Sequence, residues 1–172
     1  MGKRTRTITL SALFSAIAVL ILYFASIWPT GQLGLVAAAS LLTAAAVIET
    51  GLLSGAYVYI VSSVLGMLLV PNRVAALLFV LFFGFYPILK SLIERRGGLV
   101  IQWVLKLLVF NVSLTVLWLF FRAFFFSVFV SNSSFLLIYI VGNFVFVLFD
   151  YGFTKLVWFY IERVSRLRKK DG

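Results

Sequence analysis

The sequence predicts an all-α integral membrane protein, a bundle of six transmembrane helices with both termini in the cytoplasm. Of its 172 residues, 63% are hydrophobic and 12% are charged, and the mean hydropathy is +1.14. A soluble domain carries about 25% charged residues. The apolar residues fall into runs of about 20, the helix length that crosses about 30 Å of hydrocarbon. Basic residues collect at alternate ends of these runs, which is the pattern that sets orientation in membranes.

Helix breakers and charges separate the apolar runs. Pro29-Thr30-Gly31-Gln32 ends the first, Pro71-Asn72-Arg73 ends the third, and Glu94-Arg95-Arg96 follows the fourth. The chain is therefore expected to form a single transmembrane domain. Its spans are placed at residues 8–28, 33–48, 52–70, 74–93, 99–121 and 135–160, with a basic cytoplasmic tail at residues 163–172.

The middle spans carry their own expectations. The second and third are short and only Glu49-Thr50-Gly51 separates them, so a re-entrant pair that does not fully cross is the alternative. Glu49 is expected to cap the amino end of the third helix, where the helix dipole favours a carboxylate. Pro87 is expected to kink the fourth helix, because proline lacks a backbone donor. Lys90 and Glu94 are spaced for an ion pair one turn apart.

The distribution of cations predicts the orientation. With the amino terminus inside and six spans, the outer loops hold only Arg73 and Arg122. The cytoplasmic ends hold Lys3, Arg4, Arg6, Lys90, Arg95, Arg96, Arg163, Arg166, Arg168, Lys169 and Lys170. Cytoplasmic loops are enriched in Lys and Arg, so the bias supports both the direction and the even number of spans. The partner implied by the net charge of +10 is anionic lipid rather than nucleic acid.

The composition leaves little for catalysis. The chain has no Cys and no His, and its acidic residues number five. Thiolate chemistry and disulfides are excluded, and the commonest general base and metal ligand is missing. We expect no enzymatic activity, no metal site and no cofactor.

Small residues on the first span form a candidate docking site. Ala12 and Ala16 lie four apart, beside a parallel step from Ser11 to Ser15. Residues four apart share a helix face, and small ones let another helix approach closely. Ala12, Ser15 and Ala16 are therefore predicted to dock a partner helix. Packing within the bundle is the alternative interpretation.

Polar groups of the last two spans are predicted to meet inside the bundle. At a rise of about 1.5 Å per residue, Asn111 and Asn143 reach the same depth. Lys106 and Asp150 also fall at similar depths, and an unpaired charge there would cost several kcal/mol, about 3 or more. We therefore expect an amide pair and an intramembrane ion pair between Lys106 and Asp150.

The same polar groups have two interpretations. In one, they only fix the register of neighbouring helices. In the other, they belong to a solute cavity that opens outward, because polar residues inside a membrane often mark a functional path. The candidate substrate-binding residues are Asn111, Thr115, Trp118, Arg122, Tyr139 and Asn143.

Six short helices, cytoplasmic termini and the small-residue step between Thr9 and Ala18 resemble the S components of energy-coupling factor transporters. Asp150-Tyr151 in the last span adds to this resemblance. S components are small bacterial cytoplasmic-membrane subunits that capture a vitamin-like solute from outside. The resemblance implies that Ala12 and Ala16 dock on a membrane coupling subunit driven by two ATPases. This chain has no glycine-rich phosphate loop, so those partners would supply ATP hydrolysis.

The chain also resembles the small membrane subunits of cell-shape and envelope-assembly complexes. That resemblance implies a scaffold that does not transport. A transporter subunit needs an outward cavity with convergent polar groups, whereas a scaffold needs only packed interfaces.

Overall fold

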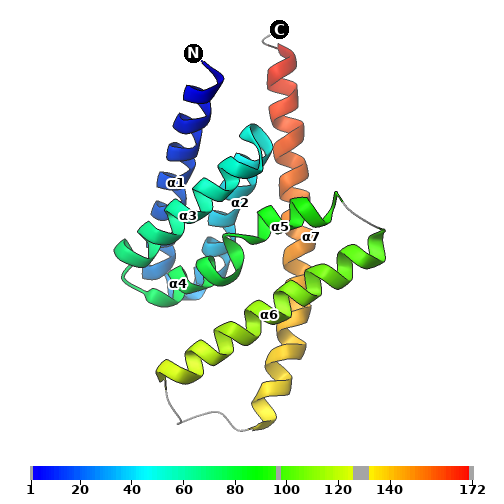
Figure 1. The fold of residues 1–172 in the computed structure, drawn as a ribbon. Helices are drawn as coiled ribbons and strands as arrows, with labels where there is room; N and C mark the ends of the chain where they lie inside the picture. Colours follow the sequence, from blue (N-terminus) through cyan, green and yellow to red (C-terminus); the bar gives the residue numbers. More distant parts are fainter. Residues whose placement is uncertain (1, 96–97, 126–131, 171–172) are drawn as a thin grey trace. The chain divides into compact units, whose positions relative to one another are not determined.

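The computed structural model describes residues 2–95, 98–125 and 132–170, with the side chains of residues 3, 29, 121–125, 132–135 and 164–170 outside the description. Helices make up almost all of this part of the chain (Figure 1). In order they are α1 (Lys3–Ile27), η1 (Pro29–Gly31), α2 (Gln32–Thr50), α3 (Leu52–Leu69), α4 (Arg73–Leu78), η2 (Phe79–Phe83), α5 (Tyr86–Ile93), α6 (Leu99–Phe125) and α7 (Asn132–Lys170).

Six helical stretches among the described residues are long and apolar enough to cross a membrane, as predicted. They run over Arg4–Ile27, Gln32–Thr50, Leu52–Leu69, Arg73–Ile93, Leu99–Phe120 and Leu136–Arg163. Both terminal helices extend past the expected spans. Helix α1 begins in the basic segment at Lys3, and α7 continues to Lys170 through most of the residues expected as a tail.

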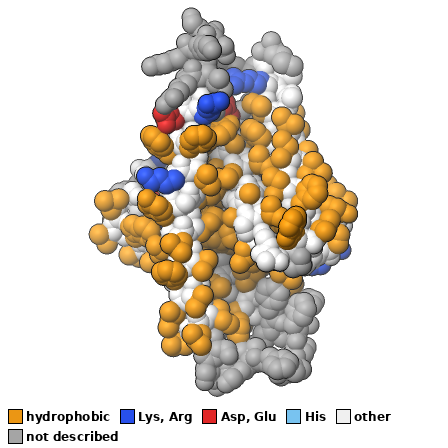
Figure 2. Space-filling view, turned by 180° about the vertical axis from the view of Figure 1, so that it is seen from behind, with side chains coloured by type: hydrophobic (Ala, Val, Ile, Leu, Met, Phe, Trp, Pro, Cys, Tyr) orange, Lys and Arg blue, Asp and Glu red, His pale blue; other side chains and the backbone are white. Residues whose placement is uncertain are grey.

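The side chains on the surface are those expected for contact with lipid. Leu99 and Val100 are exposed to 76% and 77%. Figure 2 shows hydrophobic side chains over most of the described surface on the face it draws. Soluble monomers rarely expose contiguous apolar patches of more than a few hundred Å², about 600 at most. These surfaces therefore suit hydrocarbon better than water.

The contacts divide the chain into two compact units. The first comprises residues 1–91 and 157–172, and the second comprises residues 92–156. In the first unit, α1, α2 and α3 pack against one another and against α4 (Figure 1). Its core is largely aliphatic and contains Leu22, Ala25, Val36, Ala39, Val70, Ala75, Ala76 and Phe79. The many small side chains let the helix backbones approach closely, as in other membrane bundles.

The turn between α2 and α3 differs from the expectation for Glu49. Gly51 takes φ +101°, a conformation that favours glycine, and no side chain caps α3. The prediction that Glu49 caps this helix is wrong. Glu49 lies in the last turn of α2, and its carboxylate accepts hydrogen bonds from Arg6 Nη2 (3.5 Å) and Tyr160 Oη (3.4 Å). Its partners come from α1 and α7 rather than from the next helix.

The fourth span consists of three helical pieces. Helix α4 passes into the π-helical turn η2, and after Gly84 and Phe85 the chain resumes as α5. The break therefore begins eight residues before Pro87, the only breaker that the sequence suggested.

Candidate functional site

The second unit contains a helical hairpin with a row of polar contacts along its seam. Helix α6 supplies Lys106, Asn111 and Thr115, which meet Asp150, Asn143 and Tyr139 of α7. Residue numbers rise along one helix as they fall along the other, so the two helices are antiparallel. We call these three contacts the polar ladder.

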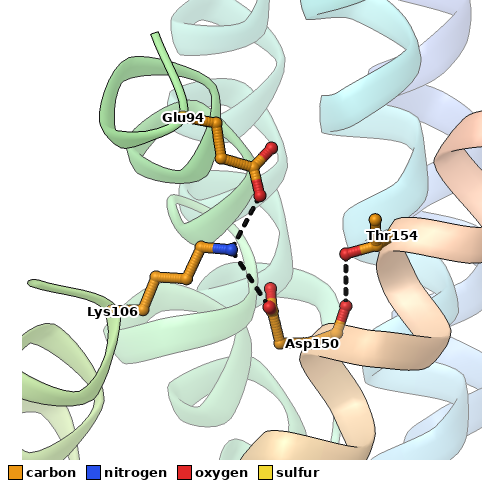
Figure 3. A network of polar contacts seen from close by, with 4 residues as sticks. All are labelled: Glu94, Lys106, Asp150 and Thr154. Carbon is orange, nitrogen blue, oxygen red and sulfur yellow. Dashed lines mark hydrogen bonds and ion pairs between the residues drawn. The ribbon is translucent and has the colours of Figure 1, made fainter. Parts of the chain in front are cut away.

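The first contact of the polar ladder is a buried ion cluster. Lys106 Nζ lies 3.1 Å from Asp150 Oδ2 and 2.7 Å from Glu94 Oε1. The side chains of Lys106 and Asp150 are only 6% and 4% exposed, whereas that of Glu94 is 39% exposed. Figure 3 shows the ammonium group between the two carboxylates, and Thr154 donating from its hydroxyl to the backbone carbonyl of Asp150 at 2.6 Å.

This cluster follows from the cost of burying charge. Removing one ion from water costs several kcal/mol, about 3 or more, unless an opposite charge with good hydrogen-bond geometry meets it. Lys106 and Asp150 were expected to pair, and the structure brings them together. Glu94, which follows the end of α5 and was expected to pair with Lys90, contacts Lys106. The ammonium also lies 5.5 Å from the ring centre of Trp103.

The second contact is a reciprocal pair of amides. Asn111 Nδ2 donates to Asn143 Oδ1 at 2.9 Å, and Asn143 Nδ2 donates to Asn111 Oδ1 at 3.1 Å. The remaining N–H of each amide donates to a carbonyl one turn back, of Leu107 or of Tyr139, at 2.8 Å. Every amide hydrogen is thus used, as a site in hydrocarbon requires.

The third contact joins Thr115 and Tyr139, whose hydroxyl oxygens lie 2.6 Å apart. The Thr115 hydroxyl donates its single hydrogen to the carbonyl of Asn111 at 2.7 Å. The Tyr139 hydroxyl must therefore be the donor in the contact between the helices.

Apolar contacts between these polar ones set the spacing of the two helices. The rings of Phe110 and Phe146 stack at 4.6 Å with an interplanar angle of 15°. A β-carbon at Gly142 would lie 3.1 Å from Leu114 Cδ2, so the glycine allows the helices to approach closely. Close packing and interhelical hydrogen bonds are the two forces that hold helices together in lipid.

The other two candidate residues lie further along α6. Trp118 is half-buried further along α6. Arg122 belongs to α6, but its side chain falls outside the described part of the structure. Of the six candidate substrate-binding residues, the structure brings together Asn111, Thr115, Tyr139 and Asn143.

The small-residue step on α1 is split between two faces. Ala12 and Ala16 are exposed, next to the exposed Leu13 and Ile17. Ser15, expected on the same docking face, is buried instead. Its hydroxyl donates to the carbonyl of Ser11 at 2.8 Å, and its own carbonyl lies 3.5 Å from the hydroxyl of Ser62 on α3. Only the two alanines remain as an outward docking surface.

Two features went unnoticed in the sequence. One is the contact of Glu94 with Lys106. The other is the group of Arg6, Glu49 and Tyr160 in the first unit. The signal available for the second was electrostatic, because Glu49 ends a span on the side where the basic residues of the amino terminus collect.

Comparisons of this chain with protein-family models, with curated proteins and with solved structures give no match.

Proposed function

We propose that the chain is the substrate-capture subunit of a multi-component, ATP-driven micronutrient importer in the bacterial cytoplasmic membrane. Both termini lie in the cytoplasm, and the coupling subunit and ATPases are separate chains. The observation that carries the proposal is the exposure of Ala12 and Ala16 on a helix face that is otherwise covered by larger apolar side chains.

A pair of exposed alanines four residues apart forms a shallow groove on a membrane helix. Leu13 and Ile17 stand beside this groove. Lipid tails contact such a groove no better than the rest of the helix surface, whereas a second helix gains close backbone contact there. The groove lies in the half of α1 nearer the basic amino terminus, on the side where a coupling subunit driven by cytoplasmic ATPases has to act.

The polar ladder supports capture of a small solute with neutral hydrogen-bonding groups. Its second and third contacts are made by amides and hydroxyls, which carry no formal charge, and they include Asn111 and Tyr139. A solute that binds there exchanges hydrogen bonds with these groups rather than neutralising a charge. Arg122 lies near the end of α6, and its positive charge favours a solute that also carries an anionic group.

A second function has an observation in its favour. Each amide hydrogen of Asn111 and Asn143 already has an acceptor. A hairpin whose polar groups satisfy one another is a stable packing unit, which is what a membrane scaffold subunit of an envelope-assembly complex requires.

Affinity purification in mild detergent, followed by mass spectrometry of proteins and retained small molecules, separates the two functions. We expect two ATPases, a membrane coupling subunit and a bound solute with the wild-type chain. Ala12→Trp with Ala16→Trp should remove the coupling subunit and ATPases while the chain still inserts, whereas Leu13→Trp, at an exposed and already bulky position, should retain them. Recovery of wall-synthesis proteins supports the scaffold. Unchanged co-purification with the double variant rejects the groove.

A further inference from the structure

The fourth span contains a local change of helix type. In an α-helix the N–H of residue 84 bonds to the carbonyl of residue 80. Here Gly84 N donates to the carbonyl of Phe79 at 2.7 Å, one residue further back. Such π-turns are rare in helices and occur frequently where a protein works.

The wider turn leaves a carbonyl without its α-helical donor, and another helix supplies one. The carbonyl of Val80 accepts a hydrogen bond at 2.9 Å from the hydroxyl of Tyr59 on α3. An unpaired carbonyl inside a membrane is costly, because no water is present there to donate to it. The Tyr59 hydroxyl therefore stabilises the π-turn form of this span over other forms.

A second backbone bond is missing just beyond the turn. Pro87 has no N–H and so cannot donate to the carbonyl of Phe83, as another residue in an α-helix would. Helical bonding resumes at the carbonyl of Phe85, which accepts from the N–H of Ile88 three residues on at 3.0 Å and from that of Leu89 four residues on at 3.1 Å. Residues 80–87 thus contain two departures from α-helical hydrogen bonding.

Tyr59 contacts the chain at two places along this break. Its ring centre lies 6.4 Å from that of Phe79, the first residue of η2, and 6.1 Å from that of Phe85, which follows η2. Gly84 makes room for it, since a β-carbon there would lie 2.7 Å from Tyr59 Cδ2 and 2.7 Å from Phe79 Cε1. One side chain therefore holds the segment through a hydrogen bond and two ring contacts.

The segment before the break is firmly held. Asn72 caps α4 by accepting from Val74 N at 3.0 Å, and Ala75, Ala76 and Phe79 belong to the core of the first unit. We propose that residues 80–87, which include the first two residues of α5, form a hinge between α4 and the rest of α5, and that the Tyr59–Val80 hydrogen bond latches it. Releasing the latch lets α5 change direction while α4 stays in place. The hinge is independent of the transported solute and of the choice between importer and scaffold.

Distance measurements between spin labels test the hinge, and the absence of native Cys means that no background substitution is needed. Arg73→Cys with Leu92→Cys places labels at exposed positions on either side of the hinge. Leu53→Cys with Leu68→Cys places a control pair along the uninterrupted α3. The full chain is reconstituted in lipid nanodiscs for both pairs.

We expect Tyr59→Phe to broaden the distance distribution across the hinge about twofold, as for a released hinge, and to leave the α3 pair unchanged. Tyr57→Phe, on the exposed face of the same helix, should leave both distributions as in the wild type. Pro87→Ala restores a backbone donor and should narrow the distribution across the hinge. If Tyr59→Phe does not fold, Pro87→Ala decides the question. A wild-type distribution in the folded Tyr59→Phe chain overturns the latch, and one in Pro87→Ala overturns the hinge.

Discussion

Asn111 and Asn143 donate to each other, at 2.9 and 3.1 Å, across the antiparallel seam of α6 and α7. Two hydrogen bonds therefore depend on each of these side chains. Because both amides also bond to carbonyls of their own helices, replacing one residue leaves the other with a partly unused amide in an apolar setting.

We expect Asn111→Ala to destabilise the chain by about 1–2 kcal/mol, with a similar loss for Asn143→Ala. The double variant should lose less than the two losses combined, with a coupling energy of about 0.6–1.7 kcal/mol, the range measured for interhelical hydrogen bonds in membranes. Reversible unfolding in mixed detergent micelles measures all three. Strictly additive losses would show that the two amides do not interact in the folded protein.

Lys106 should be the most sensitive charged position of the hairpin. Lys106→Met removes the cation between Glu94 and Asp150 and leaves the Asp150 carboxylate buried without it. Breaking a buried pair from one side costs about 3–5 kcal/mol, so we expect a sharply lower yield of folded protein. Lys106→Met combined with Asp150→Asn should recover part of that loss, since the buried carboxylate is then removed together with its cation.

A matched lysine provides the control for this prediction. Lys155 is exposed, with its ammonium 5.6 Å from the ring centre of Tyr151. Lys155→Met should change the folded yield little, because it should lower the free energy of unfolding by less than about 1 kcal/mol. Equal losses for the two lysine variants in size-exclusion chromatography would contradict the role assigned to the ion cluster. Glu94→Gln, at the more exposed carboxylate, should cost less than Lys106→Met.

Gly84 should tolerate no side chain. An alanine β-carbon at this position would lie 2.7 Å from ring atoms of both Phe79 and Tyr59 and 2.9 Å from the carbonyl of Phe79. Gly84→Ala is expected to cost about 1–3 kcal/mol through overpacking. Gly34 on α2 meets no atom within 4 Å of the equivalent position, and Gly34→Ala should be neutral or stabilising by up to about 1 kcal/mol. Thermal unfolding in detergent compares the two variants.

The sequence was informative about the hairpin and about the position of the fourth span, but uninformative about the π-turn within that span, for a physical reason. The meeting of Asn111 and Asn143 at one depth follows from a constant rise per residue along two antiparallel helices. The π-turn arises because the N–H of Gly84 donates to the carbonyl of Phe79 rather than to that of Val80. The hydropathy of the sequence is the same for an α-turn and for a π-turn. Its stabilising contact comes from Tyr59, on another helix. The Glu49 interactions likewise depend on where α1 and α7 lie, which a local capping rule does not include.

The last prediction concerns orientation, and the Cys-free chain makes it directly measurable. With both termini inside, a cysteine at Gly2 or Gly98 should react with a membrane-impermeant maleimide only after the cells are opened. A cysteine at Thr30, between α1 and α2, should react in intact cells. Thr50→Cys tests whether the second and third spans fully cross: full crossing predicts labelling only in opened cells, whereas a re-entrant pair keeps this position within the membrane and unlabelled in both. Labelling of Gly2→Cys in intact cells would place the amino terminus and its cations outside, against the charge distribution on which this topology depends.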